Sequence, residues 1–157
     1  VETVVAAQQH RAGANNMEIV VRNEWPPQDE LPLVRGAEDE LSEVFHNLLE
    51  NAIKYGRDGS QIDVRVTTGR GINQQFRPDL VRVQVINIGE TIPEEHLARL
   101  TERFYRVDKG RARSMGGSGL GLAIVKHIVN RHRGRLRITS SAGETCFSGT
   151  LQGIKKD

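Results

Sequence analysis

The chain has 157 residues, of which 37% are hydrophobic, so it fits one domain with a core between two layers. Its 22 basic and 20 acidic residues leave a formal net charge of +2, which gives nucleic-acid binding no general support. The single Cys146 excludes an internal disulfide and a cysteine-rich metal site. No apolar run approaches the roughly 20 residues of a membrane span, and Val1 does not begin a signal peptide, so we expect a soluble chain.

The first third of the chain predicts two helices with a strand between them. Residues 1–16 have apolar side chains at loose helical spacing and end in glycine and asparagine, which predicts a short helix. Residues 17–23 are rich in β-branched side chains and predict a strand. Residues 38–55 predict a long helix, with acids in the first turn and Gly56 just past its end. Its apolar stripe consists of Leu41, Val44, Phe45, Leu48, Leu49, Ala52 and Ile53.

The middle of the chain predicts a pair of half-buried strands. Valines or isoleucine alternate with polar side chains over residues 62–66 and again over 81–85. We expect these two strands to be antiparallel neighbours. Residues 68–79 between them are polar and contain glycine, which predicts a surface loop.

The last third predicts two helices followed by two strands. Residues 93–103 predict a helix that begins with a proline, and residues 106–115 have almost no apolar anchor, which predicts a mobile lid. Residues 118–132 predict a helix with one apolar face, and residues 135–139 and 145–151 predict strands. Helices and strands that mix without regular alternation favour an α+β fold. We expect a two-layer α/β sandwich with a mixed, mainly antiparallel sheet and about three helices on one face.

A glycine-rich motif directly precedes the predicted helix over residues 118–132. Gly117, Gly119 and Gly121 allow an anion to approach the backbone, and a helix start offers unpaired N–H groups and a partial positive charge. The spacing fits neither dinucleotide folds nor protein kinases well, and the motif is not a Walker loop. A phosphate-binding loop and a flexible hinge before a core helix both remain open from the glycines alone.

Polar side chains line one edge of the long helix over residues 38–55. Asn47, Asn51, Lys54 and Tyr55 fall at i, i+4, i+7 and i+8, beside the apolar stripe. Carboxamide oxygens are neutral ligands for a hard cation such as Mg²⁺, and Lys54 could neutralise a phosphate on the same edge. The alternative is a solvated polar edge.

The five histidines do not suggest a catalytic group. His46 is flanked by apolar residues and is expected to pack or cap a helix, and His96, His127 and His132 are expected on helix surfaces. His10 has no acid immediately after it, so it does not look like a phosphoacceptor.

Four segments resemble the motifs of sensor histidine kinases, in the family order and with family-like spacing. Residues 46–55 (HNLLENAIKY) resemble the N box, and residues 87–93 (NIGETIP) lie where the first glycine box belongs. Residues 101–106 (TERFYR) resemble the F box, and residues 117–122 (GSGLGL) the second glycine box. The run over residues 96–135 is most similar to phosphate-regulon sensor kinases of alphaproteobacteria.

The resemblance covers roughly residues 1–151 and implies the Bergerat fold shared with gyrase, MutL and heat-shock ATPases. We therefore expect residues 1–157 to form one catalytic and ATP-binding domain, with a lid at about 105–117 and without the dimerisation domain that carries the phosphoacceptor histidine. The implied cofactors are ATP and Mg²⁺. Asn51 would hold Mg²⁺ with support from Asn47, while Lys54 and Tyr55 would lie against phosphate and sugar.

The same resemblance assigns the rest of the nucleotide site. Asn87 would meet the adenine amino group, and Gly89 and Ile92 would shape the base pocket. Arg103 and Arg106 would contact phosphate or the partner domain, and the second glycine box would close over the phosphates. Tyr105, which lies between these two arginines in the sequence, is also assigned to the ATP site. The second glycine box consists of Gly117, Ser118, Gly119, Leu120, Gly121 and Leu122.

Two residues depart from the family pattern. The family usually has Asp where this chain has Asn87, and Gly where it has Thr91. A carboxamide can still accept from the adenine amine, so we expect binding to weaken by about 1 kcal/mol. If the backbone at Thr91 needs a positive φ, a β-branched residue there adds strain of roughly 1 to 3 kcal/mol.

The implied activity is transfer of the γ-phosphate of Mg-ATP to a histidine on a separate dimerisation domain, with a response-regulator aspartate as the next acceptor. We expect no nucleic-acid partner, a monomeric isolated domain, a homodimeric full-length kinase, and a cytoplasmic location as part of a membrane-anchored kinase. Two other functions remain open: a degenerate nucleotide-binding scaffold, and a gyrase- or MutL-like ATPase, against which the F box and short lid argue.

Overall fold

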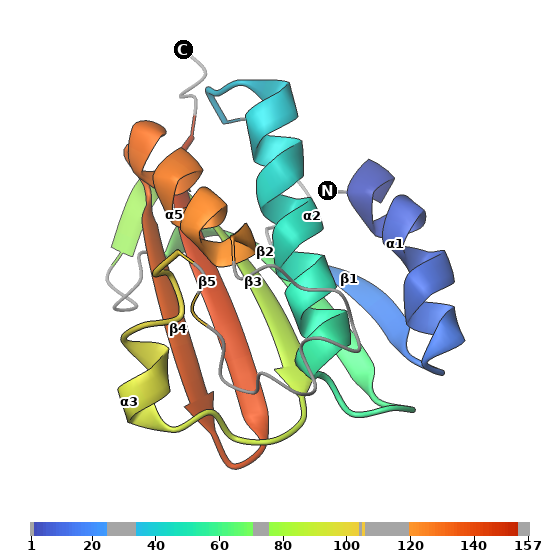
Figure 1. Ribbon diagram of the computed structural model, residues 1–157. Helices are drawn as coiled ribbons and strands as arrows, with labels where there is room; N and C mark the ends of the chain where they lie inside the picture. Colours follow the sequence, from blue (N-terminus) through green and yellow to red (C-terminus); the bar gives the residue numbers. More distant parts are fainter. Residues whose placement is uncertain (1, 25–33, 71–75, 104, 106–119, 154–157) are drawn as a thin grey trace.

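The computed structural model describes residues 2–24, 34–70, 76–103, 105 and 120–153. Within these ranges the helices and strands follow the predicted order of helix, strand, helix, strands, helix and strands, with one short helix, α3, between β3 and α5 (Figure 1). The elements are α1 (Glu2–Ala14), β1 (Glu18–Glu24), α2 (Glu38–Tyr55), β2 (Gln61–Arg70), β3 (Phe76–Ile88), α3 (Glu94–Leu97), α5 (Gly121–Arg131), β4 (Arg135–Ser141) and β5 (Glu144–Gln152).

The five strands form one sheet in the order β1-β2-β3-β5-β4. Strand β1 pairs with β2 in parallel, and the other three pairs are antiparallel, including the predicted pair β2 and β3. The expectation of a mixed, mainly antiparallel sheet is therefore confirmed. None of the helices among the described residues combines the length and apolarity that crossing a membrane requires.

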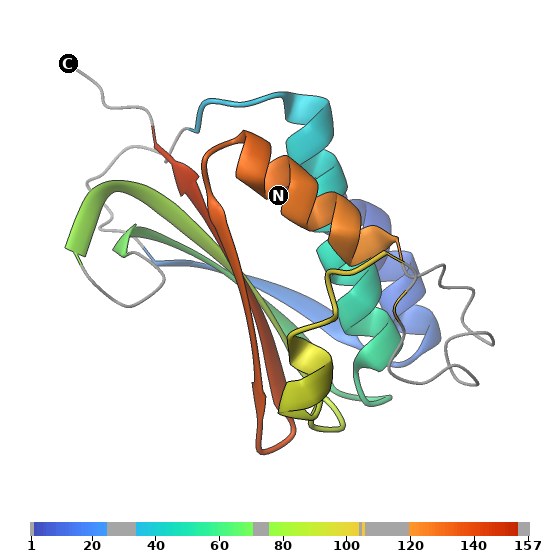
Figure 2. The ribbon, with the colours of Figure 1, turned by 60° about the vertical axis from the view of Figure 1, so that its left-hand side comes forward.

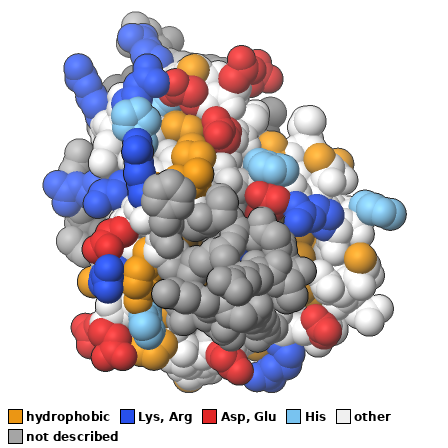
Figure 3. Space-filling model, in the orientation of Figure 1, with side chains coloured by type: hydrophobic (Ala, Val, Ile, Leu, Met, Phe, Trp, Pro, Cys, Tyr) orange, Lys and Arg blue, Asp and Glu red, His pale blue; other side chains and the backbone are white. Residues whose placement is uncertain are grey.

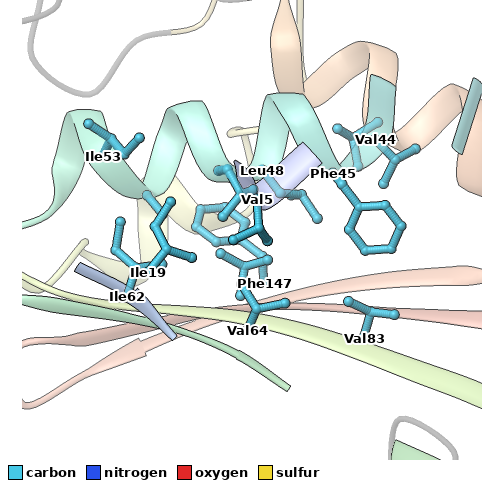
Figure 4. Close-up of a cluster of buried hydrophobic side chains, with 14 of the residues drawn as sticks. Val5, Ile19, Val44, Phe45, Leu48, Ile53, Ile62, Val64, Val83 and Phe147 are labelled. Carbon is cyan, nitrogen blue, oxygen red and sulfur yellow. The ribbon is translucent and has the colours of Figure 1, made fainter. Parts of the chain in front are cut away.

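Helices α1, α2 and α5 lie on the same face of a curved sheet (Figure 2). The core fills the space between the two layers, where side chains of α2 meet those of β1, β2, β3 and β5 (Figure 4). Burial of each large aliphatic side chain contributes about 1.5–3 kcal/mol. The buried stripe of α2 consists of Val44, Phe45, Leu48, Leu49, Ala52 and Ile53.

Helix α2 has the bounds that the sequence predicts, because its apolar period and its end signals agree. The side chain of Ala37 cannot cap the helix, and three acids in the first turn face the positive end of the helix dipole instead. The backbone N–H of Ala37 donates to Nε2 of His132 at 3.1 Å. The side chain of His132 is only 9% exposed, so the prediction of a surface histidine at this position is wrong.

His46 links α2 to α1. Its Nδ1 lies 2.6 Å from Nε2 of Gln8, which is buried between the two helices, and its Nε2 lies 3.7 Å from a carboxylate oxygen of Glu50. These contacts give His46 a structural role in the packing of α1, as expected for a histidine next to the apolar stripe.

The predicted loop over residues 68–79 is shorter than expected. Strand β2 continues to Arg70 and β3 begins at Phe76, so the two strands form a long hairpin with a register shift between Thr68 and Arg70. The polar composition of this stretch misled the prediction. Backbone pairing in a hairpin does not require apolar side chains on both faces.

The predicted helix over residues 93–103 is reduced to the four residues of α3. From Arg99 onward the backbone hydrogen bonds span three residues, as from the N–H of Arg99 to the carbonyl of His96, which is the spacing of turns. Leu100 is 4% exposed and anchors these turns to the core. Helix α5 begins at Gly121, after Leu120, while residues 118 and 119 of the prediction lie outside the described residues.

Candidate functional site

Two asparagines of α2 present their carboxamide oxygens at the edge of the helix. Nδ2 of Asn47 donates to the carbonyl of Glu43 at 2.9 Å, and Nδ2 of Asn51 donates to the carbonyl of Asn47 at 2.8 Å. Both side chains therefore use their donors within the helix, and their Oδ1 atoms are left to accept or to ligate. This arrangement explains why two poor helix formers occur one turn apart in the middle of α2.

The start of α5 packs directly against these asparagines. A Cβ added to Gly121 would lie 3.0 Å from Oδ1 of Asn47 and 3.5 Å from Nδ2 of Asn51. Only glycine allows this approach without displacing the carboxamides. Leu122 is buried in the core, which fixes the position of the α5 start, and Leu120 is half-buried at its N-cap.

Asn87 has a buried oxygen with no hydrogen-bond partner. It lies near the end of β3 opposite Thr145 of β5, on the same face of the strand as the core residue Val85. The residue is 1% exposed, and its Oδ1 accepts no hydrogen bond from any described group. Because a buried acceptor without a partner is unfavourable by about 1–3 kcal/mol, this atom suits a ligand that brings a donor such as an amino group.

Gly89 brings the segment after β3 against the end of α2. Gly56 and Gly89 form an isolated antiparallel bridge, and a Cβ on Gly89 would lie 2.4 Å from the carbonyl oxygen of Tyr55. A side chain at Gly89 would therefore separate β3 from the helix that carries Asn47 and Asn51. The close approach of the two segments requires glycine here.

Ile92 and its neighbours close the other side of the Asn87 region. Ile92 is 7% exposed, and its backbone N–H donates to Oγ of Ser140 at 2.9 Å. Ser140 and Thr145 are joined by a hydrogen bond of 2.8 Å between their hydroxyls. Ser140 and Thr145 were missed in the sequence analysis, because a serine or a threonine in a strand of alternating polar and apolar residues does not indicate a site.

The strain expected at Thr91 is absent. Among the described residues other than glycine, a positive φ occurs at Asn16, Arg133 and Ala142 but not at Thr91, so its β-branched side chain fits the backbone. Its Oγ1 accepts from the N–H of Gly143 at 2.7 Å. The threonine thus ties the segment after β3 to the β4–β5 turn.

The other predicted residues occupy two different places. Lys54 and Tyr55 are half-buried at the end of α2, with Nζ of Lys54 5.2 Å from the centre of the Tyr55 ring. Tyr105 packs at the edge of the core, where its hydroxyl contacts Nδ1 of His96 and the guanidinium of Arg99 lies 4.5 Å from its ring centre.

Arg103 borders a cavity whose lining includes neither Asn47 nor Asn51. Arg103 is exposed and lines this cavity of about 360 Å³ together with side chains of α5 such as Ala123 and His127. Arg106, Gly117, Ser118 and Gly119 lie outside the described residues, as does the predicted mobile lid. The described part of the site therefore consists of the edge of α2, the start of α5 and the end of β3.

Comparisons with known proteins show the family of the chain. The family model described as histidine kinase-, DNA gyrase B-, and HSP90-like ATPase matches residues 36–153. The phosphate regulon sensor protein PhoR of Pseudomonas aeruginosa is 43% identical over 137 residues, which is 83% of this chain and 29% of that protein. The sensor histidine kinase CusS of Escherichia coli is 47% identical over 111 residues, or 71% of this chain and 22% of that protein.

Solved structures show the same fold. The mycobacterial sensor histidine kinase MprB superposes with a TM-score of 0.74 at 26% identity, over 99% of this chain and 95% of that one. Full-length ShkA in complex with AMPPNP superposes with a TM-score of 0.79 at 22% identity, over 99% of this chain and 29% of that one. The chain spans less than a third of the length of the curated relatives PhoR and CusS. It therefore belongs to the family of histidine kinase-, DNA gyrase B- and HSP90-like ATPases, as an ATPase domain of the sensor histidine kinase type.

Proposed function

We propose that this domain binds Mg-ATP and donates its γ-phosphate to a histidine on a separate dimerisation domain of a sensor kinase. The observation that carries the proposal is the contact of Gly121 with Asn47, because it joins the end of the glycine-rich motif to the carboxamides of α2. A phosphate group and a cation need both elements at one place.

The residues present fit a magnesium nucleotide. Oδ1 of Asn51 would ligate Mg²⁺, with Asn47 in support, since the Nδ2 atoms of both residues donate within the helix. Oδ1 of Asn87 would accept from the adenine amino group, and Gly89 and Ile92 would border the base. Lys54 and Tyr55 would lie along phosphate and sugar.

The remaining assignments concern the lid and the glycine motif. Residues 117–122 would bind the phosphates through backbone N–H groups, and Tyr105 and Arg106 would contribute from the lid segment. Arg103, which is exposed beside α5, would contact phosphate or the dimerisation domain. Mg-ATP supplies the phosphoryl group, and this domain's own residues position it and neutralise charge.

The partners follow from the proposed reaction. The domain would act on the dimerisation domain of the same kinase, and a response-regulator receiver domain would accept the phosphoryl group next. We infer a homodimeric full-length kinase, anchored in a membrane, with this domain as a monomeric unit on its cytoplasmic side, where ATP is present.

Incubation with γ-labelled ATP tests the reaction. The chain alone should form no phosphohistidine, and addition of the dimerisation domain from the same kinase should produce an acid-labile, base-stable phosphoryl group on that domain. A stable phosphohistidine on any of the five histidines of this chain would contradict the division of labour. Rapid ATP hydrolysis by the chain alone would favour a gyrase-like ATPase, and nucleotide binding without transfer would favour a regulatory scaffold.

A further inference from the structure

The face of the sheet opposite the helices, here called the outer face, carries two rows of polar side chains that run across the strands. Pairing places Thr67 opposite Arg82, Arg82 opposite Thr150, and Thr150 opposite Arg135. No described helix lies on this face (Figure 2). The adjacent row consists of Arg22, Arg65, Gln84, Ser148 and Arg137.

Positive charge is concentrated in these two rows. Five arginines occupy them, and the acid at their margin is Glu24, opposite Thr67 on the edge strand β1. Asp63, in the next row, lies 3.7 Å from Nε of Arg22 and 3.5 Å from Nη2 of Arg65. On the helix side, by contrast, basic and acidic side chains are interspersed (Figure 3). The five arginines of the outer face are Arg22, Arg65, Arg82, Arg135 and Arg137.

Three buried polar atoms without a hydrogen-bond partner meet at the centre of the outer face. Arg82 is only 8% exposed, and its Nε has no hydrogen-bond partner. Thr67 lies directly opposite Arg82 on β2, and its Oγ1 is also buried without a hydrogen-bond partner. The same is true of Nε of Arg65, which lies two residues before Thr67 on the same strand. Asp63 balances part of the charge of Arg65, whereas Arg82 is a buried charged group without an ion pair among the described residues. Buried charged groups are normally paired, so Arg82 indicates that an acceptor is supplied from outside the described chain.

We propose that the outer face docks an acidic segment of a partner protein, whose carboxylates bind Arg82, Thr67 and Arg65 at the centre and the exposed arginines on either side. The arginines occupy β1, β2, β3 and β4, in a five-stranded sheet that is roughly 19 Å wide at about 4.8 Å per strand. A single small anion cannot span this width, whereas a chain of carboxylates can. Carboxylates also match the planar fork of arginine.

The outer face is poorly suited to a membrane or a nucleic acid. Ile88, at 42%, is the exposed large hydrophobic residue of the described chain, and a membrane surface favours several such side chains. The described side chains of this face include no aromatic ring on which a base could stack. An acidic polypeptide needs neither feature.

Calorimetric titration of the whole chain with a hexa-aspartate peptide at low salt tests the proposal, with hexa-serine as the uncharged probe. We expect hexa-aspartate to bind and hexa-serine not to bind. Arg82→Gln should weaken hexa-aspartate binding at least fivefold. The double variant Arg135→Gln with Arg137→Gln should do the same, and it keeps the test valid if Arg82→Gln does not fold.

A matched control removes the same charge elsewhere. Arg57→Gln with Lys126→Gln changes two exposed cations outside the outer face and should alter the affinity less than twofold. An equal loss in this control would show attraction to net charge and would overturn the proposal. No binding of hexa-aspartate, or arginine-dependent binding of phosphatidylserine vesicles in its place, would also overturn it. Titration with an ATP analogue should be unchanged in all variants, so this test is independent of the proposed function.

Discussion

Gly121 lies so close to Asn47 that a Cβ on the glycine would stand 3.0 Å from Oδ1 of the asparagine. Gly121→Ala should therefore displace the carboxamide and weaken binding of an ATP analogue by about 1 kcal/mol, roughly fivefold. Stability should not fall, because alanine is the better helix former at the start of α5. Calorimetric titration measures the affinity. Gly13→Ala, where no atom lies within 4 Å of the added Cβ, is the control, and an unchanged affinity in Gly121→Ala would contradict the assigned contact.

Asn51→Ala should abolish Mg-dependent nucleotide binding and leave the fold intact. The variant removes the proposed ligand oxygen, while α2 retains its buried stripe and gains a better helix former. Titration with an ATP analogue, with and without Mg²⁺, measures the effect. Asn130→Ala makes the same change on the exposed side of α5 and should bind as the parent does. If Asn51→Ala also binds Mg-ATP as the parent does, the metal assignment is wrong.

His132→Ala should lower the free energy of unfolding by about 2 kcal/mol. Nε2 of this histidine accepts from the backbone of Ala37 before α2, and its Nδ1 lies 2.8 Å from the carbonyl of Ile128, so it joins the two helices of the site. Urea denaturation followed by circular dichroism measures the change. His127→Ala, on the exposed side of the same helix, should cost less than about 0.5 kcal/mol. Equal stabilities for the two variants would refute the role of His132.

The thiol of Cys146 should react slowly with iodoacetamide in the folded chain. Burial raises the pKa of Cys146, and the hydrogen bonds with Ser148 and Gln84 oppose this effect only in part. The thiolate fraction at pH 8 is therefore lower in the folded than in the unfolded chain. Because the pKa of the Cys146 thiol is higher in the folded than in the unfolded chain, the protonated thiol contributes to the free energy of unfolding below the unfolded pKa of about 8.5. This contribution is lost as the pH rises through the folded pKa. Faster alkylation in native buffer than in urea would disprove this.

Sequence periodicity predicts α2 to the residue, because an apolar stripe, acids at the start and Gly56 at the end agree. It predicts a helix over residues 93–103 but not its end at Leu97, after which the turns depend on the tertiary anchor Leu100. The motif identifies Asn87, but its burial depends on Thr145 and Ser140, which are more than 50 residues away in the chain. Local patterns carry no information about such contacts.

The arginines of the outer face show the same limit. Arg65 and Arg137 alternate with apolar residues and so resemble an ordinary solvated strand face. Their common row exists only after β2, β3, β5 and β4 have paired. The buried and unpartnered Nε of Arg82 is likewise a property of the assembled sheet.

Titration of the parent, Asn87→Asp and Asn87→Ala with ATP and GTP analogues tests the nucleotide site most directly. A carboxylate in place of the carboxamide would offer the adenine amine a charged acceptor, so Asn87→Asp should tighten ATP-analogue binding by about 1 kcal/mol, or roughly fivefold. Asn87→Ala should weaken it by on the order of 1 to 3 kcal/mol and reduce the preference over the GTP analogue. If all three proteins gave flat isotherms with both the ATP and the GTP analogue, the assignment of an ATP site would be contradicted.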